Sequence, residues 1–470
     1  FGVGGTNAHV VLEEAPSAPA ASSAKSVHLL PLSARTDAAL SASAARLADH
    51  LERASGLSLA DAAYTLQVGR QTLARRGFVV ATSADEAVAA LRSSAAFRRG
   101  QPLAGAPSVI FLFPGQGSQH VDMGRGLYET EPVFKTHLDE CVAILAPLLG
   151  VELRSFLFPP EGERAVREAE LTRTRFAQPF IFSIEYALAR WWKSLGLDPA
   201  AMIGHSAGEY VAACLAGVFT LPDALALLVK RAQLMQDLPP GRMLAVRLPE
   251  DEIRPLLPSD VSIAGCNAPA LTVVSGPTGS IEHLARQLEE KGIGAKALQT
   301  SHAFHSAMMD PALEPFRRAV EATPRRPAGG RFLSTLAGGW ISPEAIAAPD
   351  YWVRQIREPV RFSAALREAM QIPNAVFLEV GPSQALTTLA AQHDDPAAPV
   401  TAVPSMRHAK EGLTDEAALL RAVGRLWCSG VAVDWHALHG SPLPRRVPLP
   451  AYPFERKRYW IEPPASAAAG

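Results

Sequence analysis

The chain has 470 residues, which is too many for one hydrophobic core and favours about two to four folded units. Hydrophobic residues make up 48% and charged residues 19%, as in folded soluble proteins, and no apolar run reaches the roughly 20 residues needed to cross a bilayer. The formal net charge of −1 gives no electrostatic reason to expect nucleic acid or an anionic membrane as a partner, so a protein or a small molecule is expected instead.

The cysteines and the first residues bear on the cellular compartment. The four cysteines include no CxxC pair, so neither a disulfide framework nor a zinc knuckle is predicted: Cys141, Cys214, Cys266 and Cys428. This pattern suits a reducing compartment, and we expect a cytoplasmic protein. The first stretch, FGVGGTNAHVVLEEAP, has no signal-peptide pattern and no initiator Met, so we expect a piece of a longer polypeptide.

The first predicted domain boundary is the Pro, Ala and Ser stretch at residues 15–26, which is typical of a linker. From about 27 to 105, apolar strand-like runs at 27–32 and 77–82 are combined with Ala-rich helical patterns. We therefore assign residues 21–105 to a small α+β unit. No acid–base cluster appears in it.

The main domain is predicted at residues 106–395. It begins with the apolar run VIFLF at 109–113, which ends abruptly in PGQGSQ, as a buried strand does when it enters a Gly-rich loop. Amphipathic helices then alternate with short apolar strands, which predicts a parallel sheet covered by helices.

A different order of elements occupies residues 241–302 within this domain. The predicted order is β-α-β-β-α-β, the ferredoxin-like arrangement, so we expect an inserted small subdomain with a cleft between it and the larger one. The six predicted elements are strand 242–247, helix 250–257, strand 261–266, strand 271–276, helix 280–292 and strand 295–300.

Residues 396–462 form the last predicted segment before a flexible tail at 463–470. A Pro-rich stretch and one helical pattern at 416–430 lead to LPAYPFERKRYWIEP at 449–463, which is expected to lie as an extended strap on another surface. The basic and aromatic FERKRYW could also suggest nucleic acid binding, but docking on a neighbouring domain explains it better.

The strongest chemical signal is GHSAGE at residues 204–209, which lies between a strand pattern and a helix pattern. This G-x-S-x-G context predicts a sharp turn that exposes the hydroxyl of Ser206 at a helix N-terminus, where free N–H groups favour an oxyanion. The alternative is a chance match in a Gly-rich and Ala-rich chain. A nucleophilic serine also needs a base within hydrogen-bond reach.

The base must come from 13 histidines, and only His302 and His305 of SHAFHS lie where the chain returns from the small subdomain. A metal pair would need further ligands, which the neighbouring residues do not supply, so no metal is expected. If either histidine is the base, a carboxylate or a carbonyl should hold its second ring nitrogen. The sequence does not name that partner.

Six motifs in order resemble the acyltransferase domains of modular polyketide synthases: FPGQGSQ (113–119), GHSAGE (204–209), RAQLMQ (231–236), HAFH (302–305), REPVRF (357–362) and LEVGPS (378–383). The resemblance covers nearly the whole chain. It implies an α/β fold with an α/β-hydrolase-like large subdomain, an inserted ferredoxin-like small subdomain and a small α+β linker domain. Residues 1–20 resemble the end of a ketosynthase, 21–105 the ketosynthase-acyltransferase linker and 396–462 the linker after the acyltransferase. His9 resembles a ketosynthase histidine that has no chemistry to perform here.

The resemblance also implies the catalytic roles. Ser206 matches the nucleophile and His305 the general base, which leaves His302 as a framework or pocket residue. The backbone carbonyl at Gln355 is expected to orient the base. The backbone N–H groups of Gln116 and Ala207 match the two donors of the oxyanion hole.

Substrate-binding residues follow from the same resemblance. Arg231 matches the residue that holds the free carboxylate of the extender unit, although its helix pattern alone would make it a solvated surface residue. Gln178 and Asn267 are also expected in the substrate site. Phe304 directly precedes the base and should lie against the α-carbon of the acyl group; HAFH resembles malonyl-selective domains, whereas YASH accompanies methylmalonyl-selective ones.

The expected function is self-acylation of Ser206 from malonyl-CoA and transfer of the malonyl group to the phosphopantetheine thiol of an acyl carrier protein. No permanently bound cofactor is expected. The partners implied are the carrier protein and an adjacent ketosynthase domain of the same polypeptide, and the isolated piece is expected to be a monomer. A methylmalonyl-specific transferase, a serine hydrolase that discharges acyl groups, and a catalytically idle scaffold remain as alternatives.

Overall fold

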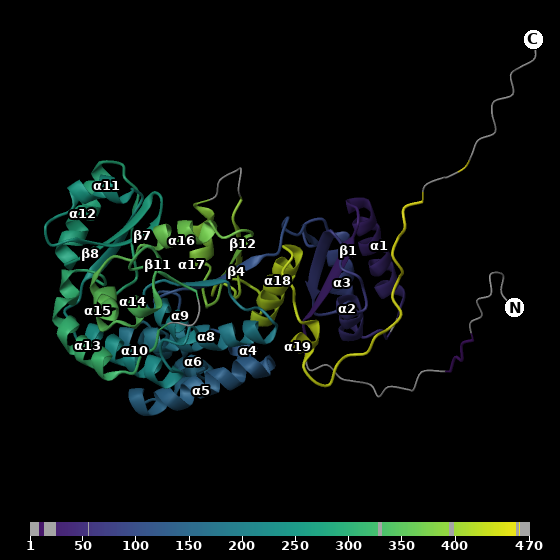
Figure 1. The fold of residues 1–470 in the computed structure, drawn as a ribbon, viewed down its shortest axis with the longest axis horizontal. Coiled ribbons are helices and arrows are strands. Elements are labelled where there is room, and N and C mark those ends of the chain that lie inside the picture. The colour runs from purple at the N-terminus through teal and green to yellow at the C-terminus, as the bar shows by residue number, and fades with distance from the viewer. Residues whose placement is uncertain are drawn as a thin grey trace, which may run out of the picture.

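The computed structural model describes residues 9–13, 25–54, 56–327, 331–393, 399–456 and 460. These residues form three sheets of three, six and four strands, and Figure 1 shows the three-stranded sheet at one end of the molecule, beside the larger body. The predicted tail at 463–470 lies outside the described residues, and so does most of segment 1–20. Among the described residues no helix is long and apolar enough to span a bilayer.

The N-terminal unit is a small α+β domain. Its antiparallel sheet has the order β1 (His28–Ala34), β2 (Arg75–Ala81) and β3 (Arg98–Gly100). Helices α1 (Asp37–Arg53), α2 (Leu59–Val68) and α3 (Ala84–Arg92) each begin after a Thr or Ser whose hydroxyl accepts a backbone N–H of the first turn. These caps satisfy N–H groups that have no partner within the helix, which explains where each helix starts.

The six-stranded sheet is the centre of the main domain. Its order is β11 (Gly339–Trp340), β10 (Phe332–Ser334), β5 (Ala201–Gly204), β4 (Ser108–Phe113), β12 (Ala375–Glu379) and β13 (Thr401–Pro404). The edge strand β11 is antiparallel to β10. The other five strands of the sheet run parallel to one another: β10, β5, β4, β12 and β13. The predicted parallel sheet is confirmed.

Helices cover both faces of this sheet, as its continuous apolar strands require. In β4, Phe111 and Phe113 belong to one hydrophobic cluster, whereas Ile110 and Leu112 belong to another. The first cluster includes α5 (Pro132–Leu149), α8 (Thr174–Ser194) and α10 (Leu221–Gln236), and the second includes α16 (Phe362–Met370) and α17 (Ala385–Ala391). Successive side chains of a strand thus enter opposite layers.

The small subdomain has the predicted ferredoxin-like topology. Strands β6 (Arg242–Val246), β7 (Ser262–Ala268), β8 (Leu271–Gly276) and β9 (Ala295–Ala297) form an antiparallel sheet in the order β7-β8-β6-β9. Helix α12 (Thr278–Glu290) connects β8 to β9.

The predicted helix at 250–257 is shorter in the structure. Helix α11 spans only Glu250–Ile253 and continues as a single 3-10 turn at Arg254–Leu256. Pro255 lies in that turn, and because it has no N–H it cannot continue the α-helical hydrogen bonds. The remaining helices are α4 (Arg125–Thr130), α6 (Leu153–Leu157), α7 (Arg164–Leu171), α9 (Gly208–Leu215), α13 (Asp310–Ala322), α14 (Pro343–Ala347), α15 (Pro349–Arg357), α18 (Asp415–Cys428) and α19 (Trp435–His439).

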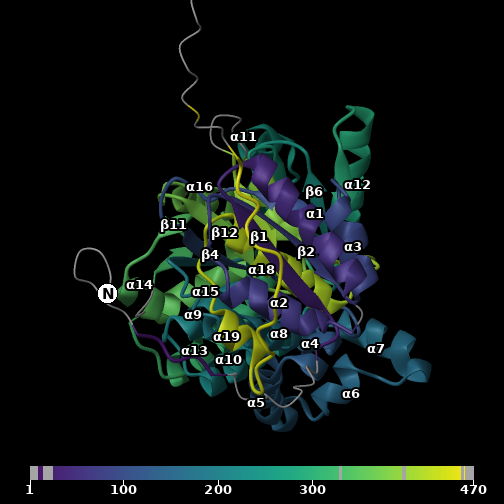
Figure 2. The ribbon, with the colours of Figure 1, turned by 90° about the vertical axis from the view of Figure 1, so that its right-hand side faces the viewer.

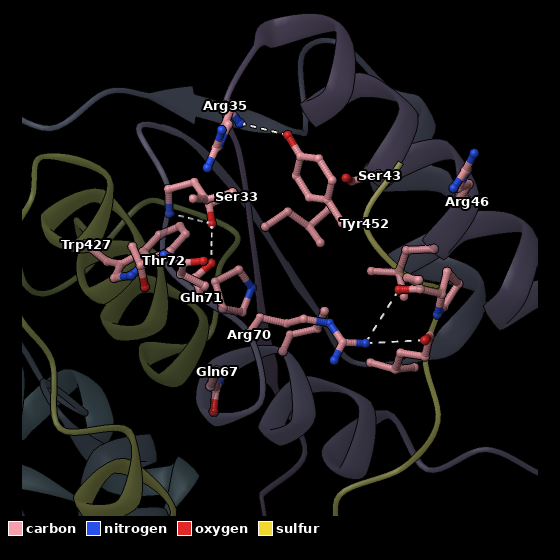
Figure 3. Close-up of a pocket in the computed structure, with 18 of the residues that line it drawn as sticks. Ser33, Arg35, Ser43, Arg46, Gln67, Arg70, Gln71, Thr72, Trp427 and Tyr452 are labelled. Atoms are coloured by element: carbon pink, nitrogen blue, oxygen red, sulfur yellow. Dashed lines mark hydrogen bonds between the residues drawn. The ribbon is translucent and has the colours of Figure 1, made fainter. Parts of the chain in front are cut away.

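The C-terminal segment contacts both the main domain and the N-terminal domain. Helix α18 packs beside the N-terminal domain, and the chain then runs along that domain as an extended strap, drawn in yellow in Figures 1 and 2. The hydroxyl of Tyr452 accepts the Arg35 N–H at 3.1 Å, and the Arg70 guanidinium donates to the Leu449 carbonyl at 3.3 Å. A cavity of about 350 Å³ lies between strap and domain (Figure 3). The described part of the strap therefore lies on the α+β domain of the same chain.

Gly424 provides a test of the packing between α18 and β2. A Cβ added at Gly424 would lie 2.5 Å from Cδ2 of the buried Phe78 ring. We expect Gly424→Ala to lower the free energy of unfolding by about 1–3 kcal/mol, because this overpacking outweighs the helix propensity gained from Ala. Urea unfolding would measure the change. Gly412→Ala is the matched control, since nothing lies within 4 Å of its added Cβ; equal stability of both variants would contradict the packing argument.

Candidate active site

Ser206 lies in a tight turn between β5 and α9. Its backbone φ is +52°, an unusual value for a residue other than glycine. A Cβ at Gly204 would lie 2.1 Å from the Glu209 backbone N, and one at Gly208 would lie 2.3 Å from the Phe113 carbonyl oxygen. Both positions therefore require glycine, and the predicted strand-turn-helix arrangement is present.

His305 is the histidine that contacts Ser206. The Ser206 Oγ lies 2.8 Å from His305 Nε2, and His305 Nδ1 lies 2.9 Å from the carbonyl oxygen of Glu358. Because a carbonyl only accepts, Nδ1 carries the proton and Nε2 is free to accept the hydroxyl hydrogen of Ser206. The arrangement can activate the serine as a nucleophile.

The surroundings of His305 keep its imidazole neutral. Burial lowers its pKa from 6.5 to about 3, and the positive charge of Arg231 adds to the shift, as does nearby His205. The carbonyl of Glu358 acts in the opposite direction by stabilising the imidazolium. A neutral imidazole can accept a proton, which is what a general base requires.

The prediction that the carbonyl of Gln355 orients the base is wrong. The carbonyl that contacts His305 belongs to Glu358, three residues later. Gln355 lies within α15, whereas Glu358 is the first residue beyond the helix and has an extended conformation with ψ of 157°. That conformation turns its carbonyl away from the helix direction and toward the imidazole.

Gln355 instead contacts the nucleophile through its side chain. Its Nε2 donates to the backbone carbonyl of Ser206 at 2.7 Å, and its Oε1 accepts from Nη2 of Arg231 at 3.4 Å. The residue thus connects the serine turn to the arginine. No sequence pattern indicated this side-chain role.

Arg231 is fully buried, and it makes no ion pair with any described residue. Its Nη1 donates to Gln178 Oε1 at 2.6 Å, and its Nη2 lies 3.4 Å from Ser206 Oγ. Its Nε has no hydrogen-bond partner among the described residues. Its guanidinium carbon lies 5.6 Å from the centre of the Tyr210 ring. Burial lowers the pKa of Arg231, because the charged form loses hydration.

Gln116 and Gln178 connect the arginine to the Gly-rich loop after β4. Gln178 Nε2 donates to Gln116 Oε1 at 3.3 Å, and Gln116 Nε2 donates to Thr174 Oγ1 at 3.3 Å. In the described part of the chain, the backbone N–H groups of Gln116 and Ala207 donate to no protein group. Both donors remain available for a bound oxyanion.

His302 and Phe304 lie on either side of Ala303, just before the base. His302 Nδ1 lies 2.7 Å from Ser301 Oγ and its Nε2 lies 3.0 Å from the Leu238 carbonyl, so both ring nitrogens contact protein groups. Phe304 is buried, with its ring centre 6.0 Å from that of His302. The described residues include no group of three or more side chains able to hold a metal ion.

Asn267, on β7 of the small subdomain, contacts the residue next to the serine. Its Oδ1 lies 2.9 Å from His205 Nε2, which therefore carries the ring proton. The bond joins the serine turn to the small subdomain.

The sequence predicts no role for Glu209, the last residue of GHSAGE. It is buried and accepts hydrogen bonds from the N–H and hydroxyl of Thr335 and from the hydroxyl of Tyr351. Burial raises its pKa to about 7, against the effect of these donors. The glutamate ties α9 to β10 and α15. In the sequence, the position of Glu209 inside the GHSAGE motif is the feature that could have indicated this role.

The acyl transferase domain family matches residues 110–433, and the CurL-like, PKS C-terminal family matches residues 28–91. The first match spans more than half of the chain and includes all the site residues above. The chain belongs to the acyl transferase domain family of polyketide synthases.

Curated relatives of this acyltransferase domain are polyketide synthases. One is a phenolphthiocerol/phthiocerol polyketide synthase of Mycobacterium tuberculosis, 40% identical over 98% of this chain and 32% of its own length. Another is the spectinabilin polyketide synthase system protein NorB of Streptomyces orinoci, 38% identical over 99% of this chain and 22% of its length. The chain thus spans a third or less of these relatives.

Solved structures confirm the fold. The acyl transferase domain of ZmaA is 35% identical, has a TM-score of 0.86 and covers 92% of this chain and 100% of its own. The acyl transferase domain of SpnD, in complex with 2-(pent-4-yn-1-yl)malonyl, is 36% identical, has a TM-score of 0.81 and covers 90% and 100% of the two chains. The α/β fold with two subdomains is therefore as predicted.

The low pKa of His305 predicts how the reactivity of Ser206 depends on pH. Because the base form persists down to a pH of about 3, labelling of Ser206 by a fluorophosphonate probe should proceed at nearly the same rate at pH 5 and pH 7. An imidazole of ordinary pKa would lose about 25-fold in rate over this range. Intact-mass spectrometry would measure the labelling, with Ser206→Ala as the blank.

A labelling rate that falls with a midpoint near pH 6.5 would contradict the low pKa of His305. The variant Arg231→Gln provides a further check, because removing its positive charge should raise the pKa of His305 and move the decline in rate to higher pH.

Proposed function

We propose that the domain loads a malonyl extender unit from malonyl-CoA onto Ser206 and transfers it to the phosphopantetheine thiol of an acyl carrier protein. The observation that carries the proposal is the position of a fully buried, unpaired Arg231 3.4 Å from the oxygen of Ser206, which in turn contacts His305. A nucleophile beside an unpaired cation suits an acyl group that has a second, negatively charged end.

In the first half-reaction, the Ser206 hydroxyl attacks the thioester carbonyl while His305 Nε2 accepts its proton. The tetrahedral intermediate collapses by breaking the C–S bond, and His305 returns the proton to the departing coenzyme A thiolate. In the second half-reaction, the carrier thiol gives its proton to His305 and attacks the serine ester. The C–O bond then breaks, and Ser206 regains the proton. Each half-reaction leaves His305 neutral, so the same group serves as base and then as acid.

The negative charge of each tetrahedral intermediate would be stabilised by the N–H groups of Gln116 and Ala207. Both lack protein acceptors among the described residues, and both lie beside the serine turn. A Cβ at Gly115 would lie only 2.7 Å from the His205 carbonyl, which indicates how closely the two backbones approach. Donors fixed in the backbone need no reorganisation during the reaction.

Arg231 would hold the free carboxylate of the malonyl group. A buried cation without an ion pair is costly, and a carboxylate ligand would remove that cost. The guanidinium can also donate two parallel hydrogen bonds to a carboxylate. The complex of the SpnD domain with a substituted malonyl group supports this substrate class for a relative.

Phe304 supports malonyl over methylmalonyl as the extender unit. Its ring is buried directly before the base, where it would leave little room for a methyl group on the α-carbon of a bound acyl group. One methyl group in an apolar pocket contributes only about 1–3 kcal/mol of discrimination, so the result is a preference rather than exclusion.

The proposed partners are inferred from the polyketide synthases to which the chain is similar. Because these are polyketide synthases much longer than this chain, an acyl carrier protein and a ketosynthase of the same polypeptide are the proposed neighbours. Transfer to a carrier, rather than to water, distinguishes this function from a hydrolase.

The central test is loading of the protein with malonyl-CoA or acetyl-CoA, followed by intact-mass spectrometry. We expect a malonyl adduct that forms faster than the acetyl adduct, is absent in Ser206→Ala and is discharged by carrier protein. The variant His305→Ala should acylate about 10²–10⁴-fold more slowly. Faster acetyl loading would overturn the role of Arg231, and an adduct that decays equally fast without carrier protein would indicate a hydrolase.

Phe304 provides a test of selectivity. We expect Phe304→Ala to raise the rate of methylmalonyl loading relative to malonyl loading about 10- to 100-fold, because the smaller side chain leaves room for the α-methyl group. Competition between the two coenzyme A esters, resolved by mass, gives the ratio. Phe304→Leu repeats the test with a smaller loss of core packing, and an unchanged ratio in both variants would rule out Phe304 as the selecting residue.

A further inference from the structure

The guanidinium of Arg231 lies between two neutral side-chain oxygens. Gln178 Oε1 is 2.6 Å from Nη1, and Gln355 Oε1 is 3.4 Å from Nη2. Buried arginines ordinarily pair with a carboxylate, since an amide oxygen only partly replaces the lost hydration. At both positions, a glutamate of nearly the same size would supply that carboxylate.

Glu209, an acidic side chain close to Arg231, does not fill this role. Glu209 is close enough for its charge to affect the pKa of Arg231, but its carboxyl group accepts hydrogen bonds from Thr335 and Tyr351. Burial also raises the pKa of Glu209 to about 7, so its negative charge is incomplete at neutral pH. The charge of Arg231 therefore remains largely uncompensated by the described residues.

Both glutamines are held in place by other contacts. Gln178 is buried on α8, and its Nε2 lies 3.3 Å from Gln116 Oε1 and 3.7 Å from the sulfur of Met235. Gln355 is buried on α15, and its Nε2 donates to the Ser206 carbonyl. Each amide thus presents its oxygen to Arg231 because its nitrogen has an acceptor elsewhere.

We propose that Gln178 and Gln355 determine the class of acyl group, because they orient Arg231 without neutralising it. The positive charge of the guanidinium then stays available to pair with the carboxylate of a dicarboxylic acyl group. This inference rests on the proposed function and extends it: selectivity for an acid-bearing extender unit depends on the absence of charge at these two glutamines as well as on the presence of the arginine.

Gln178→Glu tests the proposal with a minimal change of shape. The new carboxylate would pair with Nη1 from the protein itself and would repel the carboxylate of the substrate. We expect the ratio of malonyl to acetyl loading rates to fall about 100-fold, within the range measured for buried charge pairs. Gln355→Glu is a less direct test, because it would also place a negative charge beside the Ser206 carbonyl.

Gln178→Met is the matched control. It removes the amide, including its bond to Gln116, but adds no charge and leaves Arg231 unpaired. Its malonyl to acetyl ratio should stay within about 10-fold of the ratio for the unchanged protein, even if both rates fall. Rates would be measured by quenched-flow sampling and intact-mass spectrometry, and labelling by a fluorophosphonate probe would confirm that each variant keeps a reactive Ser206.

The possible results separate this inference from the proposed function. If the unchanged protein does not prefer malonyl over acetyl, the proposed function fails before any variant is considered. If it prefers malonyl and Gln178→Glu keeps that preference, the proposal for the glutamines is overturned. It is also overturned if Gln178→Met loses the preference as completely as Gln178→Glu, because the effect would then come from the lost amide and not from the added charge.

Discussion

The close approach of backbones around Ser206 is the constraint on which the site depends. A side chain at Gly204 or Gly208 would collide with main-chain atoms of Glu209 or Phe113, so the chain can pass from β5 to α9 in this way only with glycine at both positions. The result is a serine with φ of +52°, next to the free N–H of Ala207 and the loop after β4. Backbone strain of this kind persists where surrounding structure holds it, and here Ser206 lies between the buried strand β5 and the largely buried helix α9.

Around this turn, the charges are arranged for a ligand that the protein does not supply. Burial keeps His305 neutral, Arg231 makes no ion pair with the described residues, and neutral glutamine oxygens accept hydrogen bonds from its nitrogens. The free protein therefore carries an electrostatic cost that substrate binding would relieve. Under the proposed function, part of the stability of the fold would be exchanged for selectivity, as is common at sites with perturbed pKa values.

Local patterns predicted what depends on local sequence. The glycine spacing identified the serine turn, the alternation of strands and helices identified the parallel sheet, and the β-α-β-β-α-β order identified the sheet of the small subdomain. The sequence could not locate the carbonyl that orients His305, because this depends on α15 ending at Arg357 and on the direction in which Glu358 leaves the helix. Nor could it show that Arg231 is buried, since its helix pattern fits a solvated residue equally well. The observed helix is shorter than the predicted one at 250–257, because Pro255 has no N–H with which to continue the α-helical hydrogen bonds.

A crystal structure of the malonyl-Ser206 acyl-enzyme would test whether Arg231 holds the free carboxylate of the acyl group. We expect the free carboxylate to lie within hydrogen-bond distance, about 3 Å, of the terminal nitrogens of Arg231. The ester carbonyl oxygen should face the N–H groups of Gln116 and Ala207. A malonyl group whose carboxylate points to solvent, with Arg231 still bound only to Gln178 and Gln355, would contradict this role of Arg231.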